Sequence, residues 1–328
     1  MSQDIRHFHD IHGSDVYAPS RILLSRRPTV GTQDIQPSFD CLIVVLHSIY
    51  QHCIVGTDSP PDWLAKAEEK NPILGYAWLM FSHGAREDSL AWRRKVFKAV
   101  FSFGPSFENF CTSSLMNETF WSQDEFRLSR NFHSIETGDI VEGSADDIAR
   151  ASILEFDHAM NPSLTLDKVV EKSFGVISFK GQDVASIPSN PWIVRLQYKP
   201  ALNASERLDI NGLKLLYLPV WEQLMSQTNE GYREVGKAPY FLMAVVRLRD
   251  GDHQEEFVRT YNSYGANILA DDDPEHPVNN TWSVKDSPGS YMLFYGLKTF
   301  VDLEDPMQFP EVGTPMIPPE RAWVSDLV

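Results

Sequence analysis

Four residues of this chain have types and spacings that suit thiol chemistry: Cys41, Gln36, His253 and Asp286. Cys41 stands where a polar turn gives way to an apolar run of helix length. A helix N-terminus there would present free N–H groups and the positive end of the helix dipole, which favour a thiolate. Gln36, five residues upstream, could donate a hydrogen bond to an oxyanion. On this stretch alone the alternative is a core cysteine in a buried helix, because free cysteine is among the most buried residue types.

A thiol nucleophile needs a base, and the base needs an acceptor that orients it. His253 lies in the turn between two predicted strands, residues 240–247 and 256–261, and Asp286 comes just before a third. Single His and Asp residues in loops are usually surface residues, so the interpretation depends on the joint pattern. We take Cys41 as the candidate nucleophile, His253 as its base and Asp286 as the orienting group.

The composition excludes several classes of protein. The chain has 328 residues, of which 42% are hydrophobic, and a net charge of −16 from 29 basic and 45 acidic residues. This charge argues against a nucleic-acid partner and leaves room for a basic protein or peptide. Three cysteines without a CxxC pair give neither a disulfide framework nor a zinc site, the first residues contain no apolar signal region, and no apolar run is long enough to span a membrane. We expect a cytoplasmic and/or nuclear protein without cofactor, metal or membrane contact.

Apolar periodicity predicts helices in the first half of the chain, including residues 41–53 and an amphipathic helix over residues 88–103. The predicted apolar face of the second helix consists of Trp92, Val96, Val100 and Phe103. Its opposite side is basic and contains Arg93, Arg94, Lys95 and Lys98. We interpret this side as a solvated face, with a binding patch as the alternative.

Alternating, β-rich runs separated by Gly, Pro and Asn turns follow a helix predicted over residues 164–174. They predict strands over residues 174–179, 192–198, 213–218, 240–247, 256–261 and 291–295. The expected fold class is therefore α+β, with a helical half packed on an antiparallel sheet and a site in a cleft between them.

The domain organisation follows from these shifts in pattern. Residues 1–35, which include His7, His9 and His12, lack periodicity and are expected to form a disordered or extended arm; a metal site at the histidines is the alternative. Residues 36–328 are expected to form one catalytic domain. Its parts are a helical subdomain (36–155), a β-rich subdomain (156–300) and a C-terminal tail (301–328).

At this point the residues resemble the ubiquitin-specific proteases, the papain-like deubiquitinating cysteine peptidases. Gln36 and Cys41 match the family's amide five residues before the nucleophile, and residues 240–246, read Tyr-Phe-Leu-Met-Ala-Val-Val, followed by His253, match its His box. The sequence Trp282-Ser-Val-Lys-Asp286 and the later Leu-Phe-Tyr match its last box. The resemblance covers residues 36–298.

The chain also departs from the family pattern. The Asn-Ser pair usual after the cysteine is Val44-Val45, the Gly before the histidine is Asp252, and the aromatic after it is Gln254. An insertion with Asp271-Asp-Asp273 separates the last two boxes. No cysteines occur where the family's zinc-binding fingers would lie, so these fingers are expected to be reduced or absent.

The resemblance implies a papain-like fold with thumb and palm, and a thiol hydrolase that cleaves the C-terminal Gly-Gly bond of ubiquitin or a ubiquitin-like protein. His253 would deprotonate Cys41, Asp286 would hold the imidazole, and Gln36 with the Cys41 N–H would stabilise the oxyanion. The acidic residues Asp252, Glu255 and Glu256 would steer ubiquitin's basic tail, or would form a solvated loop. Two alternatives stay open: an inactive relative that binds ubiquitin as a scaffold, and an unrelated α+β protein.

Overall fold

The computed structural model describes residues 3–25, 28, 37–81, 86–225, 230–249, 256–261, 282–285 and 289–298. Gln36, His253, Asp286 and the predicted tail over residues 301–328 lie outside the described residues. The helices of the described part are α1 (Tyr17–Ser25), α2 (Pro37–Cys53), α3 (Leu64–Lys70), α4 (Pro72–Tyr76), α5 (Arg86–Val100), α6 (Phe107–Cys111), α7 (Ser114–Met116), α8 (Ala145–Ala151) and α9 (Leu166–Lys172). The strands are β1 (Ser129–Ser134), β2 (Ile153–Asp157), β3 (Gly175–Phe179), β4 (Gln182–Pro188), β5 (Ile193–Lys199), β6 (Leu215–Met225), β7 (Glu230–Arg247), β8 (Phe257–Thr260) and β9 (Tyr291–Leu297).

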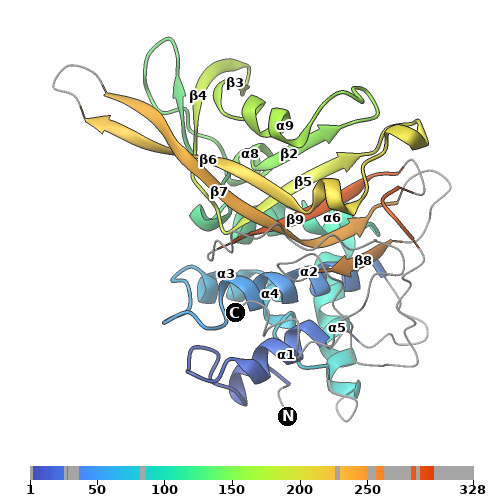
Figure 1. The fold of residues 1–328 in the computed structure, drawn as a ribbon. Coiled ribbons are helices and arrows are strands. Elements are labelled where there is room, and N and C mark those ends of the chain that lie inside the picture. The colour runs from blue at the N-terminus through green and yellow to red at the C-terminus, as the bar shows by residue number, and fades with distance from the viewer. Residues whose placement is uncertain are drawn as a thin grey trace.

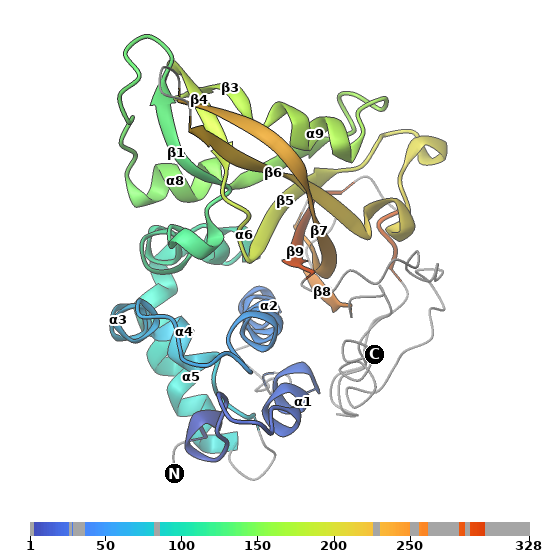
Figure 2. The same ribbon diagram turned by 60° about the vertical axis from the view of Figure 1, so that its left-hand side comes forward.

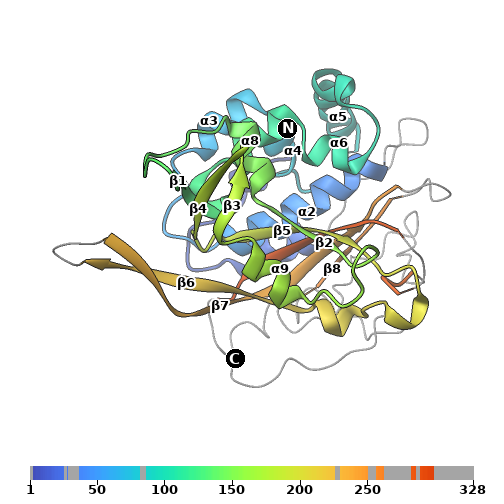
Figure 3. The same cartoon turned by 90° about the horizontal axis from the view of Figure 1, so that it is seen from above.

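The strands form two sheets. The larger has the order β2-β5-β9-β7-β6, and β8 pairs with the end of β7. All of its pairs are antiparallel except β2 with β5, which is parallel and departs from the expected antiparallel sheet. The smaller sheet has the order β1-β4-β3 and is antiparallel. The outer parts of β6 and β7 extend away from the rest of the molecule as a two-stranded ribbon (Figure 3).

Helices α1 to α5 lie on one side of the larger sheet, and α9 lies on the other with the smaller sheet (Figure 1). Alternation along β9 shows how the sheet joins two cores, because Met292 and Phe294 contact the helical core while Leu293 and Tyr295 belong to the core on the opposite face. Helix α2 runs against the sheet at this inner face (Figure 2). The protein is therefore a mixed α and β structure in which the helical first part packs on the sheet; the papain-like layout and the cleft stay predictions.

The structure of residues 3–25 contradicts the disordered or extended arm that was predicted over residues 1–35. Residues 5–7 form a 3-10 turn, α1 follows, and the side chains of Ile5, Ile11 and Leu23 are buried in the helical core. Backbone hydrogen bonds from Ile5 N–H to Trp78 O and from Met80 N–H to the carbonyl of residue 3 fix it further. These apolar residues are too far apart to show a periodicity, so the sequence pattern missed them.

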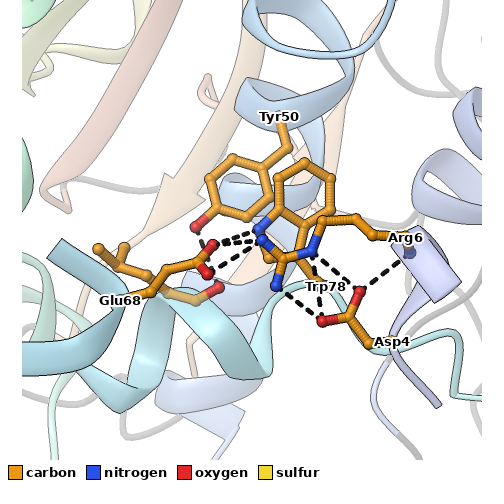
Figure 4. Close-up of polar contacts among 6 residues, drawn as sticks. Asp4, Arg6, Tyr50, Glu68 and Trp78 are labelled. Atoms are coloured by element: carbon orange, nitrogen blue, oxygen red, sulfur yellow. Dashed lines mark hydrogen bonds and ion pairs between the residues drawn. The ribbon is translucent and has the colours of Figure 1, made fainter. Parts of the chain in front are cut away.

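A polar cluster joins this segment to α3 (Figure 4). The Arg6 guanidinium lies over the Trp78 ring at 4.9 Å and donates hydrogen bonds to the carboxylates of Asp4 and Glu68. Glu68 also accepts a bond of 2.7 Å from the Trp78 indole N–H. The ring of Tyr50, from α2, stacks on the Trp78 ring with a distance of 4.3 Å between the ring centroids.

Most predicted elements are present with shifted ends. Strand predictions over 192–198, 240–247, 256–261 and 291–295 correspond to β5, β7, β8 and β9. The helix predicted over 164–174 is α9, and its cap residue Thr165 accepts a hydrogen bond from the Lys168 N–H. The predicted helix over 88–103 is α5, and Val96 and Val100 of its predicted apolar face are buried, but Trp92 and Arg93 depart from the prediction. Arg93 is 2% exposed and Trp92 is 42% exposed, so Arg93 faces the core and the solvated interpretation is wrong for this residue.

Candidate functional site

The first turns of α2 place Cys41 at the junction between the helices and the sheet. The helix begins at Pro37, a residue favoured at the first helical position because its ring fixes φ and it has no N–H to leave unpaired. The apolar run after Asp40 is buried almost without interruption, which holds α2 in the helical core. Cys41 is 5% exposed. The predicted position of Cys41 near a helix start is thus confirmed, and so is its burial.

Cys41 contacts the residue that precedes β8. Its Sγ donates a hydrogen bond to the backbone oxygen of Glu256, 215 positions later in the sequence, over 3.8 Å. Phe257 begins β8, which pairs with β7 from Ala244 to Arg247. The segment that carries the cysteine and the strand that follows the predicted His turn are therefore brought together.

The Glu256 side chain is buried at this junction, with 3% of the residue exposed. The Phe107 N–H donates to both carboxylate oxygens, at 3.1 and 2.9 Å from Oε1 and Oε2. The Arg249 N–H approaches Oε1 at 3.4 Å, and Arg249 Nε lies 4.0 Å from Oε2. A buried carboxylate next to a helix start is favoured by the unpaired N–H groups there, and Phe107 is the first residue of α6. For Glu256, both the predicted steering role and the predicted solvated loop are therefore wrong.

Two further contacts connect this carboxylate to the start of α2. Arg249 Nη2 lies 3.4 Å from Ser38 Oγ, and the Ser38 hydroxyl donates to Pro105 O over 2.7 Å. The start of α2, the loop before α6 and the segments on either side of the predicted His turn thus form one connected junction around Cys41.

Asp40, the residue before the cysteine, forms a bidentate ion pair with Arg93 of α5. The two N···O distances are 2.7 and 3.1 Å, and the Arg93 guanidinium also lies over the Phe97 ring at 5.4 Å. Burial raises the pKa of the Asp40 carboxyl to about 6, while the Arg93 charge opposes this rise. The carboxylate next to Cys41 in the sequence is therefore engaged by α5, whereas the thiol contacts Glu256.

The strand after the predicted His turn also contacts the box that carries Asp286. Arg259 of β8 lies over the Trp282 ring at 4.2 Å, and its Nη2 donates to Trp282 O over 2.7 Å. Trp282 is buried in the core on the outer face of the sheet. Of the four predicted site residues, only Cys41 is described, so the triad itself stays a prediction.

No local pattern in the sequence indicated that Glu256, Arg249 and Arg93 are parts of this junction. Each looks like an ordinary surface charge in the sequence, and its role depends on a partner from a distant segment: Phe107, Ser38 and Asp40, respectively. Among the described residues, no group of three His, Cys, Asp or Glu side chains is placed to hold a metal ion. In the same part of the chain, no helix is both long and apolar enough to cross a membrane.

Comparisons with known proteins give weak similarities. No protein-family model matches the chain, and no curated protein sequence matches it. Among solved structures, the SAGA DUB module with Ubp8, Sgf11, Sus1 and Sgf73 is similar with a TM-score of 0.33 and 13% identity, over 90% of this chain and 73% of that chain. The Saccharomyces cerevisiae Pan2 pseudoubiquitin hydrolase–RNA exonuclease module in complex with AAGGAA RNA has a TM-score of 0.29 and 9% identity, over 92% of this chain and 52% of that one. The chain thus spans about half the length of the Pan2 chain.

These neighbours are deubiquitinase-type modules, one of them a pseudo-hydrolase. With TM-scores below 0.5, they do not define the family of this chain. The expectation that nucleic acid is not a partner also stays a prediction.

Proposed function

We propose that this protein is a thiol-dependent hydrolase of the cytoplasm and/or nucleus that cleaves the C-terminal Gly-Gly (iso)peptide bond of ubiquitin or a ubiquitin-like protein. Cys41 is the nucleophile, His253 the base, Asp286 the orienting group and Gln36 an oxyanion donor. The fold in this proposal is that of the papain-like peptidases, with the helices as thumb and the larger sheet as palm.

The observation that carries this proposal is the contact between Cys41 and Glu256. The sequence resemblance requires the cysteine and the His box to meet, and the two segments are 215 positions apart. His253 precedes Glu256 by three residues, and three residues of chain span at most about 10 Å. If the sequence resemblance were due to chance, there would be no reason for these two distant segments to be in contact. The contact between Arg259 and Trp282 links the third box to the same strand.

In the proposed reaction the Cys41 thiol gives its proton to His253, and the thiolate attacks the carbonyl carbon of the last glycine. Collapse of the tetrahedral intermediate breaks the C–N bond, and the leaving amine takes the proton from His253. Water then hydrolyses the thioester, which releases the free carboxylate of the modifier and restores the thiol. Gln36 would contribute on the order of 3 kcal/mol to stabilising the oxyanion.

A second candidate function is favoured by the surroundings of the thiol. Cys41 is 5% exposed and its Sγ–H is bonded to a carbonyl, an arrangement that suits a resting thiol better than a reacting one. In this second proposal the protein is a catalytically weak or inactive relative that binds ubiquitin or a ubiquitin-like protein as a scaffold.

A ubiquitin probe with a C-terminal thiol-reactive group separates the two candidates. For the hydrolase we expect labelling of the wild type, none for Cys41→Ala, and a strong reduction for His253→Ala. Cys53→Ala is the matched control, because Cys53 is also in α2 but buried at the other end of the helix. Absence of labelling together with saturable binding of ubiquitin would support the scaffold. Absence of both would contradict both proposals.

A further inference from the structure

Glu256 is a buried carboxylate that the proposed triad does not use. Its residue is 3% exposed, and the Phe107 N–H is shared between its two oxygens. A buried carboxylate is costly unless hydrogen bonds or charges compensate it, so the position of this side chain is narrowly defined by its partners. The same residue covers Cys41 with its backbone, because Glu256 O accepts the Cys41 Sγ–H.

We propose that Glu256 is a positioning residue that controls access to the Cys41 thiol. Its carboxylate, held by the Phe107 N–H, fixes the start of β8 across the first turns of α2. In that position the Glu256 carbonyl holds the thiol proton and the segment shields the sulfur. The role of Cys41 as nucleophile rests on the proposed function above; the control of its accessibility does not.

The geometry makes the side chain and the backbone of Glu256 act together. The side chain points to α6 and the carbonyl points to α2, so one residue connects both helices to the sheet. Arg249 approaches the same carboxylate and reaches Ser38 at the start of α2. When the carboxylate is released, the start of β8 loses its fixed position over the thiol. A modifier tail that enters the site must displace this segment in the same way.

Alkylation of Cys41 by iodoacetamide at pH 8 measures this control directly, with the modified residue identified by peptide mass. Cys53 and Cys111 serve as internal references, because burial raises the pKa of both thiols. In Glu256→Ala we expect the Cys41 rate to rise about tenfold or more, since a lost hydrogen bond to a charged group shifts an opening equilibrium by at least that factor. In Glu256→Gln the amide oxygen still accepts from the Phe107 N–H, so the rate stays within about threefold of the wild type.

The matched control is Glu108→Ala, which removes an exposed carboxylate from the first turn of the same helix α6. Its Cys41 rate should equal that of the wild type. An unchanged rate in Glu256→Ala, with a native circular dichroism spectrum, would overturn the proposal. An equal rise of the Cys41 alkylation rate in Glu256→Gln and Glu256→Ala would also overturn it. The side-chain oxygen that accepts from the Phe107 N–H would then not be what protects the thiol.

If Glu256→Ala does not fold, Glu256→Asp replaces it. Aspartate keeps the buried charge but is one methylene shorter, so it reaches the Phe107 N–H only if the start of β8 moves. A rise in the Cys41 rate then supports the proposal, and a wild-type rate contradicts it.

The ubiquitin probe applied to the same variants distinguishes this proposal from the proposed function. Faster alkylation together with faster probe labelling of Glu256→Ala supports both. Faster alkylation without any probe labelling supports the positioning role and contradicts the hydrolase.

Discussion

The three thiols of the chain are all buried but have different surroundings. Cys53 and Cys111 lie in the helical core, where burial raises the pKa of Cys53 well above its ordinary value and that of Cys111 to about 12. Cys41 lies near the start of a helix and donates to a backbone carbonyl of a different segment. A helix start favours a thiolate, whereas a carbonyl acceptor needs the proton to stay on sulfur. The reactivity of Cys41 is thus decided by whether the start of β8 stays in contact with it.

His52, at the far end of α2, provides a prediction about acid stability. Its Nε2 lies 3.0 Å from Leu297 O and its ring meets Phe241 edge-on, and burial lowers its pKa from 6.5 to about 4. At a pH between these two pKa values, His52 carries a proton in the unfolded chain but not in the folded chain. The free energy of unfolding therefore decreases as the pH falls through this range, with a His52 contribution of up to about 2 kcal/mol between pH 7 and pH 5.

Urea unfolding of the wild type and of His52→Gln at both pH values checks this. The variant should lose less stability on acidification than the wild type does. His7→Gln, which changes an exposed histidine, should behave like the wild type. An identical pH dependence in His52→Gln and the wild type would contradict the lowered pKa.

The candidate site could be predicted from the sequence only where its signal is local. Pro37 and the apolar run after Asp40 indicate a helix start, so the position of Cys41 was predictable. The role of Glu256 was not, because it depends on the Phe107 N–H, 149 positions away. The burial of Arg93 likewise depends on Asp40, which pairs with it across two helices.

The packing of α2 on β9 depends on the absence of a side chain at Gly296. A Cβ there would lie 2.8 Å from His52 Cδ2 and Nε2 and 3.3 Å from Met243 Sδ. Gly296 pairs with Ile193 on one side and Phe241 on the other, so its backbone has little freedom to move away. Gly296→Ala should therefore destabilise the fold by about 1–3 kcal/mol through overpacking.

Replacement of His52 removes the ring that the new methyl group meets. We expect the double variant Gly296→Ala with His52→Ala to be more stable than the sum of the single effects, by at least about 1 kcal/mol in a urea-unfolding cycle. Gly231→Ala is the control, because a Cβ at that position meets no atom within 4 Å. Strict additivity of the two changes would show that α2 and β9 can move apart without cost.

At the scale of elements, the sequence predicted what has a regular pattern over many residues. Strands β5, β7 and β9 were predictable because their apolar runs are long and β-branched or aromatic. Strands β1, β2 and β4 were missed. Strands β1 and β4 contain few such residues, and β2 is defined by its pairing with β5. Helix α1 was missed for a similar reason, since Leu23 packs in the core while Pro19 and Ser20 obscure its periodicity.

The larger sheet separates the two large apolar cores of the described residues, and a third, small cluster lies in the smaller sheet. The helical core contains residues from α2 and from the inner face of β5, β7 and β9, so the helices and the sheet share one set of contacts. Arg195 of β5 adds a polar link, because its guanidinium lies over the Trp121 ring at 4.3 Å and donates to Ala149 O. The sheet therefore completes the core on which the helices pack.

This shared core predicts that the helices and the sheet unfold together. Leu46 of α2 is fully buried in the helical core, and Leu46→Ala should lower the free energy of unfolding by about 2–5 kcal/mol. Hydrogen exchange measured by mass spectrometry should show that the free energy of opening decreases by the same amount for the slowest amides of α2 and of β9. Both sets of amides exchange only through the same global opening. Leu202→Ala, at an exposed position, should leave the exchange of the α2 and β9 amides unchanged. If β9 keeps wild-type protection in Leu46→Ala, the sheet keeps its structure when the helices open. The junction between Cys41 and Glu256 would then be the boundary between two units that unfold independently.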